Sequence, residues 1–485
     1  MLQSGNAVSA MAPRFESGRW VHSLSIRERP VASGVHVTRM VARRKFRGPG
    51  SGISEILGGF GIVLATGSLL LMLPIASESG DWGSLVDAVF TAVSAICVTG
   101  LVLHDTQAHW SAFGEGVIVL LIQVGGLGYM LGTTVVLWAF GRQLGLRDRN
   151  MLRLYYGAPS MKETLSFARG VALFTLMFEA AGAAILTAAF LVDGHDPGEA
   201  LWWGIFHAVS AFNNAGFSVT GADMAPFSGN PVVLLTLTTL IVAGGIGFIP
   251  LLMLKNRRSF RRLPLDSKLI LSTSAALLVA GTLFVGVFEW RNDGTLGAVP
   301  AEDRPVVALF HSANARTAGF SAIDVGALHD ESKVLTVGLM FVGGAAGSTA
   351  GGLKVGAFAM LFAVMLATLR GREEVSVFRR QVPTAIIQQA TTLALYFVAL
   401  VFSFSLALTL TSHQEFLDTL FETMSALGTV GFSAAGTPVF GTGGHVVLIV
   451  AMLFGRFSPL MLVLYMSQPR KKPTYHSPTD SVRLG

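Results

Sequence analysis

Apolar segments long enough to cross a lipid bilayer recur along this chain of 485 residues. They lie near residues 53–76, 113–140, 165–192, 230–254, 267–290, 333–369, 384–411 and 445–466. A helix needs roughly 20 apolar residues to span the hydrocarbon core. Only helices and closed barrels satisfy their backbone polar groups within lipid. The pattern therefore predicts an all-α integral membrane protein with eight main transmembrane segments.

The composition excludes several other classes of protein. Charged residues make up 13% of the chain, whereas they make up about 25% of a typical soluble domain. The net charge of +6 comes from short basic clusters between apolar segments, which is not the pattern of a nucleic-acid-binding domain. The single cysteine, Cys97, cannot form an intrachain disulfide, and no Cys or His spacing indicates a structural zinc site.

Basic and acidic connections alternate between the apolar segments. Basic residues cluster within 39–47, 142–162, 255–268, 370–380 and 470–472. The connections 77–112, 193–229 and 412–444 contain no Lys or Arg and carry Asp and Glu instead. The positive-inside rule then places the basic connections and both termini in the cytoplasm. The acidic outer face would attract cations.

An internal repeat lies within the outer connections. Its four copies are FTAVSAICVTGL from Phe90, FHAVSAFNNAGF from Phe206, FHSANARTAGF from Phe310 and FETMSALGTVGF from Phe421. Each copy predicts a helix too short to span, followed by a glycine-bearing loop, between two crossing segments. We expect four membrane–pore-loop–membrane repeats around a central pore. The expected parts are an N-terminal extension 1–50, repeats 51–141, 163–255, 267–370 and 382–467, and a C-terminal tail 468–485.

Irregular backbone at membrane depth is tolerated only where protein or water satisfies it, so the four loops are expected to share an axial cavity. A dehydrated monovalent cation needs several oxygen dipoles at once, and backbone carbonyl oxygens supply them without a full counter-charge. Glycine allows the loop conformations that turn carbonyls inward. The expected cation selectivity filter comprises Val98, Thr99, Gly100, Asn214, Ala215, Gly216, Thr317, Ala318, Gly319, Thr429, Val430 and Gly431.

These features resemble the Trk/Ktr/HKT superfamily of potassium transporters over roughly residues 53–467. Besides the four loops, the resemblance rests on SAICVTGL at 94–101, IQVGGLGYM at 122–130, GGAAGSTAGGLK at 343–354 and GRFSPL at 455–460. Glycine in all four loops is similar to the potassium-selective bacterial members, whereas plant sodium-type members carry serine in the first loop. The number of crossings resembles the Ktr branch, and the N-terminal extension leaves the choice between Ktr and Trk open.

The sixth apolar segment is interrupted by a run of Gly, Ser and Thr, which are poor helix formers. A phosphate-binding loop is not expected here, because no strand precedes the run and Lys354 does not directly follow its last glycine. The resemblance implies that 343–354 is an intramembrane gate. A cation inside a crossing segment is unfavourable in lipid, so Arg456 should face protein or water. The expected gating residues are Gly343, Gly344, Gly347, Ser348, Thr349, Gly351, Gly352, Lys354 and Arg456.

A barrier to potassium and a structural pairing with a carboxylate both remain open as roles for Arg456. Glu179 is a second ionisable residue within a crossing segment, without an evident partner. His207 and His311 are expected to be packing or solvated residues.

The segment GGLGYMLG at 125–132 lacks the strand that a Rossmann site requires, so any nucleotide would bind a separate subunit, and no cofactor is expected. The resemblance implies a homodimer on a cytoplasmic ring of RCK-type nucleotide-binding regulatory domains.

We therefore expect a channel-like potassium uptake subunit. A sodium-coupled or potassium/sodium symporter of the same fold is the alternative. A membrane enzyme is not expected, because no coherent set of His, Cys or carboxylates lies at one membrane depth. A scaffold or sensor that keeps the pore fold without conducting is a third reading.

Overall fold

The structure is a computed structural model, which describes the backbone of residues 14–16, 19–21, 50–141, 161–257, 259–372 and 374–466. Most of the expected N-terminal extension, the basic connection from 142 to 160 and the expected C-terminal tail lie outside the described residues. The chain divides into two compact units, Met1–Ile62 and Val63–Gly485, each taken by itself below.

The first unit contains a small antiparallel hairpin. Strand β1 (Arg14–Glu16) pairs with β2 (Arg19–Val21), and Phe15 lies opposite Trp20. The helix α1 (Gly50–Leu71) begins in this unit.

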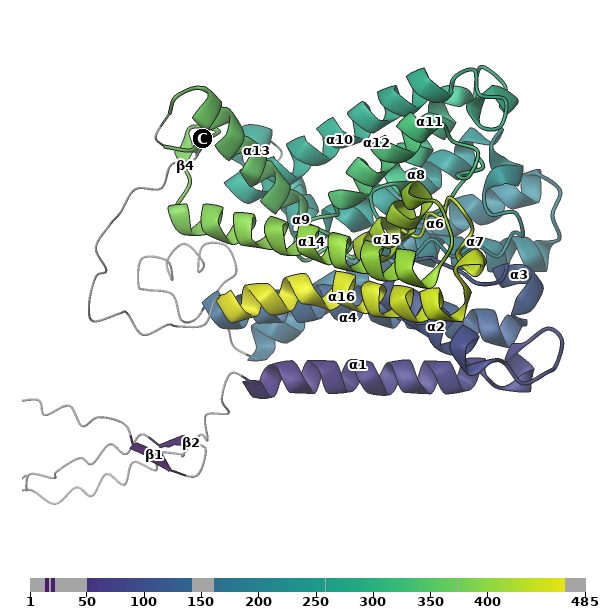
Figure 1. Ribbon diagram of the computed structural model, residues 1–485, viewed down its shortest axis with the longest axis horizontal. Coiled ribbons are helices and arrows are strands. Elements are labelled where there is room, and N and C mark those ends of the chain that lie inside the picture. Colours follow the sequence, from purple (N-terminus) through teal and green to yellow (C-terminus); the bar gives the residue numbers. More distant parts are fainter. Residues whose placement is uncertain are drawn as a thin grey trace, which may run out of the picture. The chain divides into compact units, whose positions relative to one another are not determined.

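The second unit is almost entirely helical (Figure 1). Its longer helices are α4 (Ala112–Gly141), α6 (Met161–Val192), α8 (Pro231–Ile246), α9 (Phe248–Arg257), α10 (Leu265–Glu289), α12 (Asp330–Phe341), α13 (Val355–Leu369), α14 (Thr384–Thr411) and α16 (Gly441–Met466). Its shorter helices are α2 (Leu85–Cys97), α3 (Thr106–His109), α7 (Pro197–Asn213), α11 (Arg304–Asn314) and α15 (Phe416–Gly428). The minor elements are η1 (Pro74–Ala76), η2 (Ala225–Phe227), η3 (Phe260–Arg262), η4 (Leu296–Ala298), η5 (Thr437–Phe440), β3 (Ser376–Val377) and β4 (Arg380–Gln381).

By length and composition, four helices of the described residues can cross a membrane. They cover Ala168–Val192, Leu265–Glu289, Thr384–Thr411 and Thr437–Phe457. The pair α8 and α9 makes a fifth if the two count as one span. The chain is therefore a multi-pass membrane protein.

The apolar segment 230–254 forms two helices, α8 and α9, which meet at an angle of 96°. The break lies at Gly247, whose φ of +81° is a conformation that other residues rarely adopt. A Cβ at Gly247 would lie 3.2 Å from the Cα of Ser348. The bend thus makes room for a segment that is 101 positions later in the chain.

The chain between α12 and α13 is not helical, and it carries the glycine-rich run. Its two ends pair with each other, because Gly343 N donates to Leu353 O at 2.8 Å and Val355 N donates to Gly344 O at 3.1 Å. Ala345 N also donates to Gly245 O at 2.9 Å, at the end of α8. This segment, 342–354, is therefore an ordered part of the helical unit.

The short helices α2, α7, α11 and α15 follow one packing rule. Each contacts a long helix that is its neighbour in the sequence: α2 contacts α4, α7 contacts α6, α11 contacts α10, and α15 contacts α14. Three of them also contact a long helix from earlier in the chain: α7 packs on α4, α11 on α8, and α15 on α12. The contact between α2 and α16 completes the cycle.

Candidate functional site

Each of the four short helices runs directly into a loop that contains one of the repeated glycines. All four glycines have positive φ: 92° at Gly100, 70° at Gly216, 80° at Gly319 and 100° at Gly431. The residue two positions before each glycine also has positive φ, namely Val98, Asn214, Thr317 and Thr429. Such a conformation is rare for residues other than glycine, and for a β-branched residue it is an outlier. We call the segments 98–100, 214–216, 317–319 and 429–431 the glycine loops.

The four glycine loops close into a ring. A Cβ at Gly100 would lie 2.5 Å from the carbonyl oxygen of Ala215. A Cβ at the other three glycines would clash in the same way with the next loop: Gly216 with Ala318 O, Gly319 with Val430 O, and Gly431 with Thr99 O. Each glycine thus leaves room for the backbone of the next loop, and the fourth abuts the first.

The surroundings of the ring favour a cation. The carboxyl ends of α2, α7 and α15 lie one residue before a glycine loop, and that of α11 lies three residues before one. The end of a helix carries a partial negative charge over about its last turn. The side-chain oxygens of Thr99, Thr317 and Thr429 are buried and have no hydrogen-bond partner among the described residues. Oxygen dipoles without an internal partner therefore gather at the ring.

Side chains of the short helices hold the loops, and these residues were not among the predicted site residues. Ser94 Oγ accepts from Gly100 N at 3.1 Å, and Ser425 Oγ accepts from Gly431 N at 3.0 Å. In the other two copies the bond reaches the residue after the glycine: Ser210 Oγ accepts from Phe217 N, and Asn314 Oδ1 accepts from Phe320 N, each at 3.0 Å. The signal was available, because a hydrogen-bonding residue recurs five or six positions before each glycine.

Glycines of the long helices let these helices approach the short ones. A Cβ at Gly125 would clash with Ile96 O, one at Gly244 with Phe212 O, and one at Gly455 with Leu427 O. The carbonyls belong to the last turns of α2, α7 and α15. The motif IQVGGLGYM and its counterparts therefore serve close packing behind the glycine loops.

Glu179, whose partner the sequence did not indicate, lies behind the second glycine loop. It is 5% exposed, and its two carboxylate oxygens accept from Gln123 Nε2 at 3.2 Å and from Asn213 Nδ2 at 2.9 Å. Asn213 Nδ2 also donates to Gln123 Oε1 at 2.9 Å. Because Asn213 directly precedes Asn214, this network positions the second loop from α4 and α6.

The segment 342–354 packs against two of the glycine loops. Thr349 Oγ1 donates to Asn214 Oδ1 at 2.9 Å and lies 3.3 Å from Phe212 O. A Cβ at Gly351 would clash with Thr429 Oγ1. The segment thus contacts the second and fourth loops, on the side where their short helices end.

The two cations of this region both bind backbone carbonyls. Arg456 is 1% exposed, and its guanidinium donates to Thr349 O and, at 3.2 Å, to Gly125 O. Lys354 Nζ donates to Ala350 O at 2.7 Å. Arg456 therefore links α16 to the 342–354 segment and to α4.

Arg316 lies within the third repeat copy and was not among the predicted site residues. Its guanidinium donates to the backbone oxygen and to Oγ of Ser274 on α10, each at 3.1 Å. It therefore ties the third glycine loop to α10. His207 and His311 are both buried: His207 bonds Ser218 Oγ at 3.0 Å, and His311 stacks on Phe432 with ring centroids 4.9 Å apart.

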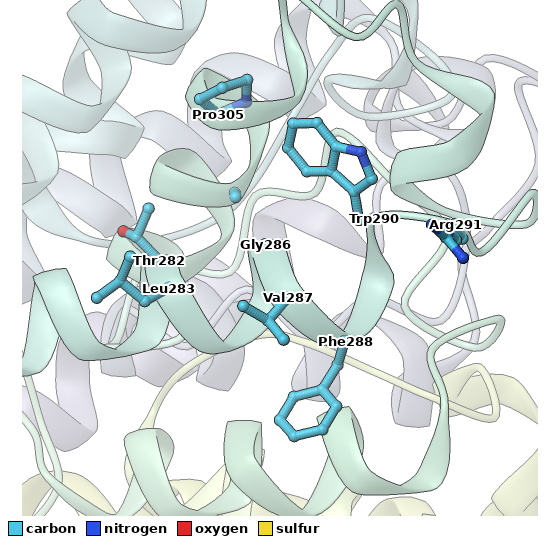
Figure 2. A pocket seen from close by; sticks show the side chains of 9 residues that line it. Thr282, Leu283, Gly286, Val287, Phe288, Trp290, Arg291 and Pro305 are labelled. Carbon is cyan, nitrogen blue, oxygen red and sulfur yellow. The ribbon is translucent and has the colours of Figure 1, made fainter.

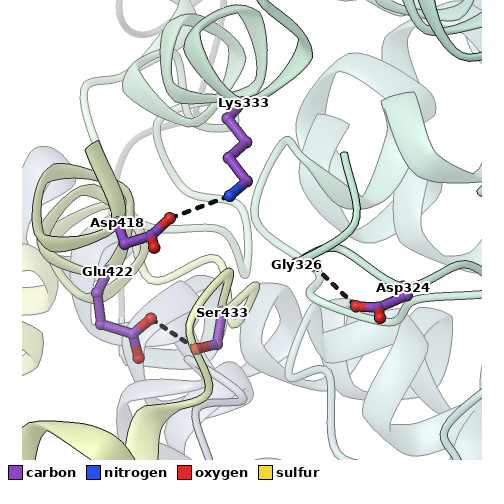
Figure 3. A network of polar contacts seen from close by, with 6 residues as sticks. All are labelled: Asp324, Gly326, Lys333, Asp418, Glu422 and Ser433. Atoms are coloured by element: carbon purple, nitrogen blue, oxygen red, sulfur yellow. Dashed lines mark hydrogen bonds and ion pairs between the residues drawn. The ribbon is translucent and has the colours of Figure 1, made fainter. Parts of the chain in front are cut away.

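The connections after the glycine loops carry a polar network (Figure 3). Lys333 on α12 forms an ion pair of 3.1 Å with Asp418 on α15. Glu422 accepts from Ser433 Oγ at 2.7 Å, and Asp324 accepts from Gly326 N at 2.9 Å. The bonds of Asp418 and Glu422 join the fourth short helix to α12 and to the chain that leaves the fourth loop, and the bond of Asp324 is local to the connection after the third loop.

Asp223 joins the connections that follow the second and third loops. Its carboxylate accepts from Ser321 N at 2.5 Å. Burial raises the pKa of Asp223 to about 8, and the charge of Asp105 adds to the rise. Its other carboxylate oxygen is buried without a hydrogen bond to the described chain. Within the described residues, no group of three or more His, Cys, Asp and Glu side chains could hold a metal ion.

Comparisons with known proteins agree on one family. The model of the cation transport protein family TrkH matches residues 60–473. The chain is 37% identical over 406 residues to the Ktr system potassium uptake protein B of Bacillus subtilis, covering 84% of this chain and 90% of that protein. It is 33% identical over 456 residues to the potassium/sodium uptake protein NtpJ of Enterococcus hirae, covering 92% of this chain and all of that protein.

A crystal structure of the potassium transporter TrkH from Vibrio parahaemolyticus has the same fold. It matches with a TM-score of 0.68 and 19% identity, over 88% of this chain and 86% of that one. The family consists of transporters and not of enzymes. On the family match and the identity to its curated members, the chain belongs to the TrkH family of cation transport proteins, as a membrane subunit of the Trk/Ktr potassium transporter type.

Proposed function

We propose that this chain takes up potassium through the ring of glycine loops, in a channel-like manner and down the electrochemical gradient. The observation that carries the proposal is the closed ring itself, in which each glycine abuts the backbone of the next loop. Four loops at the ends of four short helices can present carbonyl oxygens to one dehydrated ion. The relatives named for potassium uptake support the choice of ion.

In this proposal the selectivity filter consists of the four glycine loops, with potassium as the transported ion and no resident cofactor. The three Thr hydroxyls without a partner would add oxygen ligands at the ring. The chain would then comprise four membrane–pore-loop–membrane repeats, over 51–141, 163–255, 267–370 and 382–467, with eight main crossings. The cyclic packing of the short helices on preceding long ones supports this division.

The segment 343–354 would be the gate. It lies against Asn214 and Thr429, so an ion leaving the ring on that side meets it directly. Arg456 would hold the gate shut, since it donates to the carbonyl of Thr349, and its charge would raise a barrier to a cation. Lys354 would fix the end of the segment through Ala350.

Assembly and location follow from the resemblance and from the charge pattern. We place the chain in the bacterial inner membrane as a homodimer, with both termini in the cytoplasm. A cytoplasmic RCK-type ring, which binds the nucleotide, would release the gate. The relatives named as parts of a Ktr system support a multicomponent assembly.

The test is growth at low potassium and uptake of radioactive rubidium in bacteria that lack their own potassium systems. Wild type, Gly319→Asp and Gly100→Ser are compared, with and without the regulatory ring. We expect Gly319→Asp to abolish uptake, because a side chain there clashes with Val430 O. We expect Gly100→Ser to lower the preference for potassium over sodium. Full uptake by Gly319→Asp would contradict the proposed filter.

A second candidate is sodium-coupled or combined potassium/sodium uptake by the same fold. The relative named as a potassium/sodium uptake protein, matched over its whole length, favours it. Rubidium uptake measured with sodium replaced by choline separates the two: a loss of uptake indicates coupling, and unchanged uptake indicates a channel-like path.

A further inference from the structure

A groove of about 680 Å³ opens along the outer surface of α10 and α11 (Figure 2). Its lining is apolar except for one hydroxyl and one cation: Thr282, Leu283, Gly286, Val287, Phe288, Trp290, Arg291, Pro305 and Ala308. Such a volume falls within the range of roughly 300–1,000 Å³ of small-molecule sites. The groove is separate from the ring of glycine loops, since it includes none of the loop residues.

Gly286 has no packing role that explains its presence in a long apolar helix. A Cβ built there would have no neighbour within 4 Å, whereas a Cβ at Gly281 of the same helix would clash with Ser312 Oγ. Glycine is unfavourable within a helix relative to alanine. The absence of a side chain at Gly286 therefore leaves open space that forms part of the groove.

One end of the groove is rigid. Arg304 donates to Trp290 O and Val299 O at 2.8 Å and to Gly297 O at 2.9 Å, and its guanidinium lies 5.4 Å from the centre of the Trp290 ring. Arg304 is thus fully engaged with its own neighbours. Trp290 is fixed in place as the end wall of a groove that is already formed.

Among the described residues, Arg291 is the only charged one that lines the groove, and it is available to a ligand. It is exposed, and it forms no ion pair or hydrogen bond within the described chain. It follows the end of α10, a helix long and apolar enough to cross the membrane. Trp and Arg at the end of such a helix lie at the level of the lipid headgroups. Figure 2 shows Trp290 and Arg291 at one side of the groove and Thr282 and Leu283 at the other.

We propose that this groove binds one anionic phospholipid, with an acyl chain against Gly286 and Val287 and the headgroup phosphate on Arg291. Leu283 and Val287 are 62% and 74% exposed, so these apolar side chains of the groove can contact a lipid acyl chain. The guanidinium complements a phosphate in charge and in geometry. The inference requires only that α10 crosses the membrane, and it does not depend on potassium transport.

A second copy of this chain fits the groove less well. A twofold axis that passed through the groove would bring it against its own image, and two concave surfaces leave a void between them. Such an interface would also bring two copies of Arg291 towards each other without an acidic residue in the lining. The charge and shape of the groove therefore favour the lipid.

The test is native mass spectrometry of the full chain, titrated with phosphatidylglycerol and, separately, with phosphatidylcholine. Gly286→Phe fills the groove, and Arg291→Gln removes its cation. Gly338→Phe is the matched control, because Gly338 on α12 is exposed and, like Gly286, has no neighbour within 4 Å of a built Cβ. The oligomeric state of each variant is read from the same spectra.

We expect wild type and Gly338→Phe to retain one tight phosphatidylglycerol per chain and Gly286→Phe to lose it. Arg291→Gln should bind phosphatidylglycerol about fivefold more weakly, with little change for phosphatidylcholine. Equal phosphatidylglycerol binding by wild type and Gly286→Phe would overturn the proposal. Unchanged lipid binding with loss of dimers in Gly286→Phe would assign the groove to a second copy instead. Equal affinity of the wild type for the two lipids would overturn the role of Arg291.

Discussion

Thr349 Oγ1 donates a hydrogen bond of 2.9 Å to Asn214 Oδ1 and so joins the proposed gate to the second glycine loop. Thr349→Val keeps the size of the side chain and removes this bond. A hydrogen bond contributes about 0.5–1.5 kcal/mol, so its loss shifts a closed–open equilibrium by about two- to tenfold. We expect rubidium uptake by proteoliposomes that contain this subunit alone to rise by that factor.

The control is Thr368→Val, since Thr368 on α13 is exposed and its hydroxyl bonds only Val364 O of its own helix. It should leave uptake at the wild-type level. Equal uptake by wild type and Thr349→Val would show that this bond does not restrain the gate.

Glu179 positions the second glycine loop through Asn213, which predicts graded effects of its replacement. Glu179→Gln keeps one acceptor, whereas Glu179→Met leaves Gln123 Nε2 buried without its acceptor and leaves Asn213 Nδ2 with only Gln123 Oε1 and Val209 O. An unsatisfied buried donor costs about 1–3 kcal/mol. We expect a clear fall in thermal stability and in rubidium uptake for Glu179→Met and a smaller one for Glu179→Gln.

Glu302→Met serves as the control for Glu179, because Glu302 is exposed in a connection. It should change neither measurement. Wild-type behaviour of Glu179→Met would mean that the loop holds its shape without the network.

Close packing behind the loops predicts opposite effects for two Gly→Ala changes. A methyl group at Gly244 would clash with Phe212 O and lie 2.7 Å from Asn214 Oδ1, so Gly244→Ala should destabilise the protein by about 1–3 kcal/mol. Gly338 lies on a helix with open space around it, so Gly338→Ala should stabilise by about 0.4–1 kcal/mol. Thermal unfolding in detergent, followed by tryptophan fluorescence, measures both. Equal midpoints for the two variants would contradict the packing argument.

Asp223 predicts a pH dependence of stability. Its pKa rises from 3.8 to about 8 on folding, so the native state keeps a proton that the unfolded chain releases. Its contribution to stability is therefore present below about pH 4 and is lost as the pH rises towards 8. Asp223→Asn cannot ionise and should lack this loss. We expect the wild type to lose stability relative to Asp223→Asn between pH 5 and pH 8, measured by thermal unfolding. A constant difference over that range would refute the raised pKa.

Features that depend on a few neighbouring residues were accessible from the sequence. Helices long enough to cross a membrane are visible as apolar segments, because hydrocarbon thickness sets their length. The positive φ at Gly100 and Gly431 belongs to a local turn, so the recurrence of glycine after a short helix marks it. The identity of the ion and the gating roles stay predictions, because they concern ion passage and movement of the 342–354 segment.

Features created by packing could not be predicted from the sequence. Arg456 reaches Gly125, which is 331 positions away in the chain, and no local pattern marks that pair. The bend at Gly247 was not predicted, because the helix on each side is apolar and the residue that lies against the bend, Ser348, is in another segment. Glu179 was recognisable as an unusual carboxylate, but its partners lie on α4 and α7.

The closed ring of glycine loops comes from one polypeptide, so mutation can change each loop independently. In a ring built from four identical subunits, a single codon substitution alters every corner at once. Here the corners at Gly100, Gly216, Gly319 and Gly431 are encoded separately, so a substitution alters one corner and leaves three intact. Selection can therefore change one loop of the ring at a time. Different residues, such as Val98 and Asn214, already occupy equivalent positions in the first two loops.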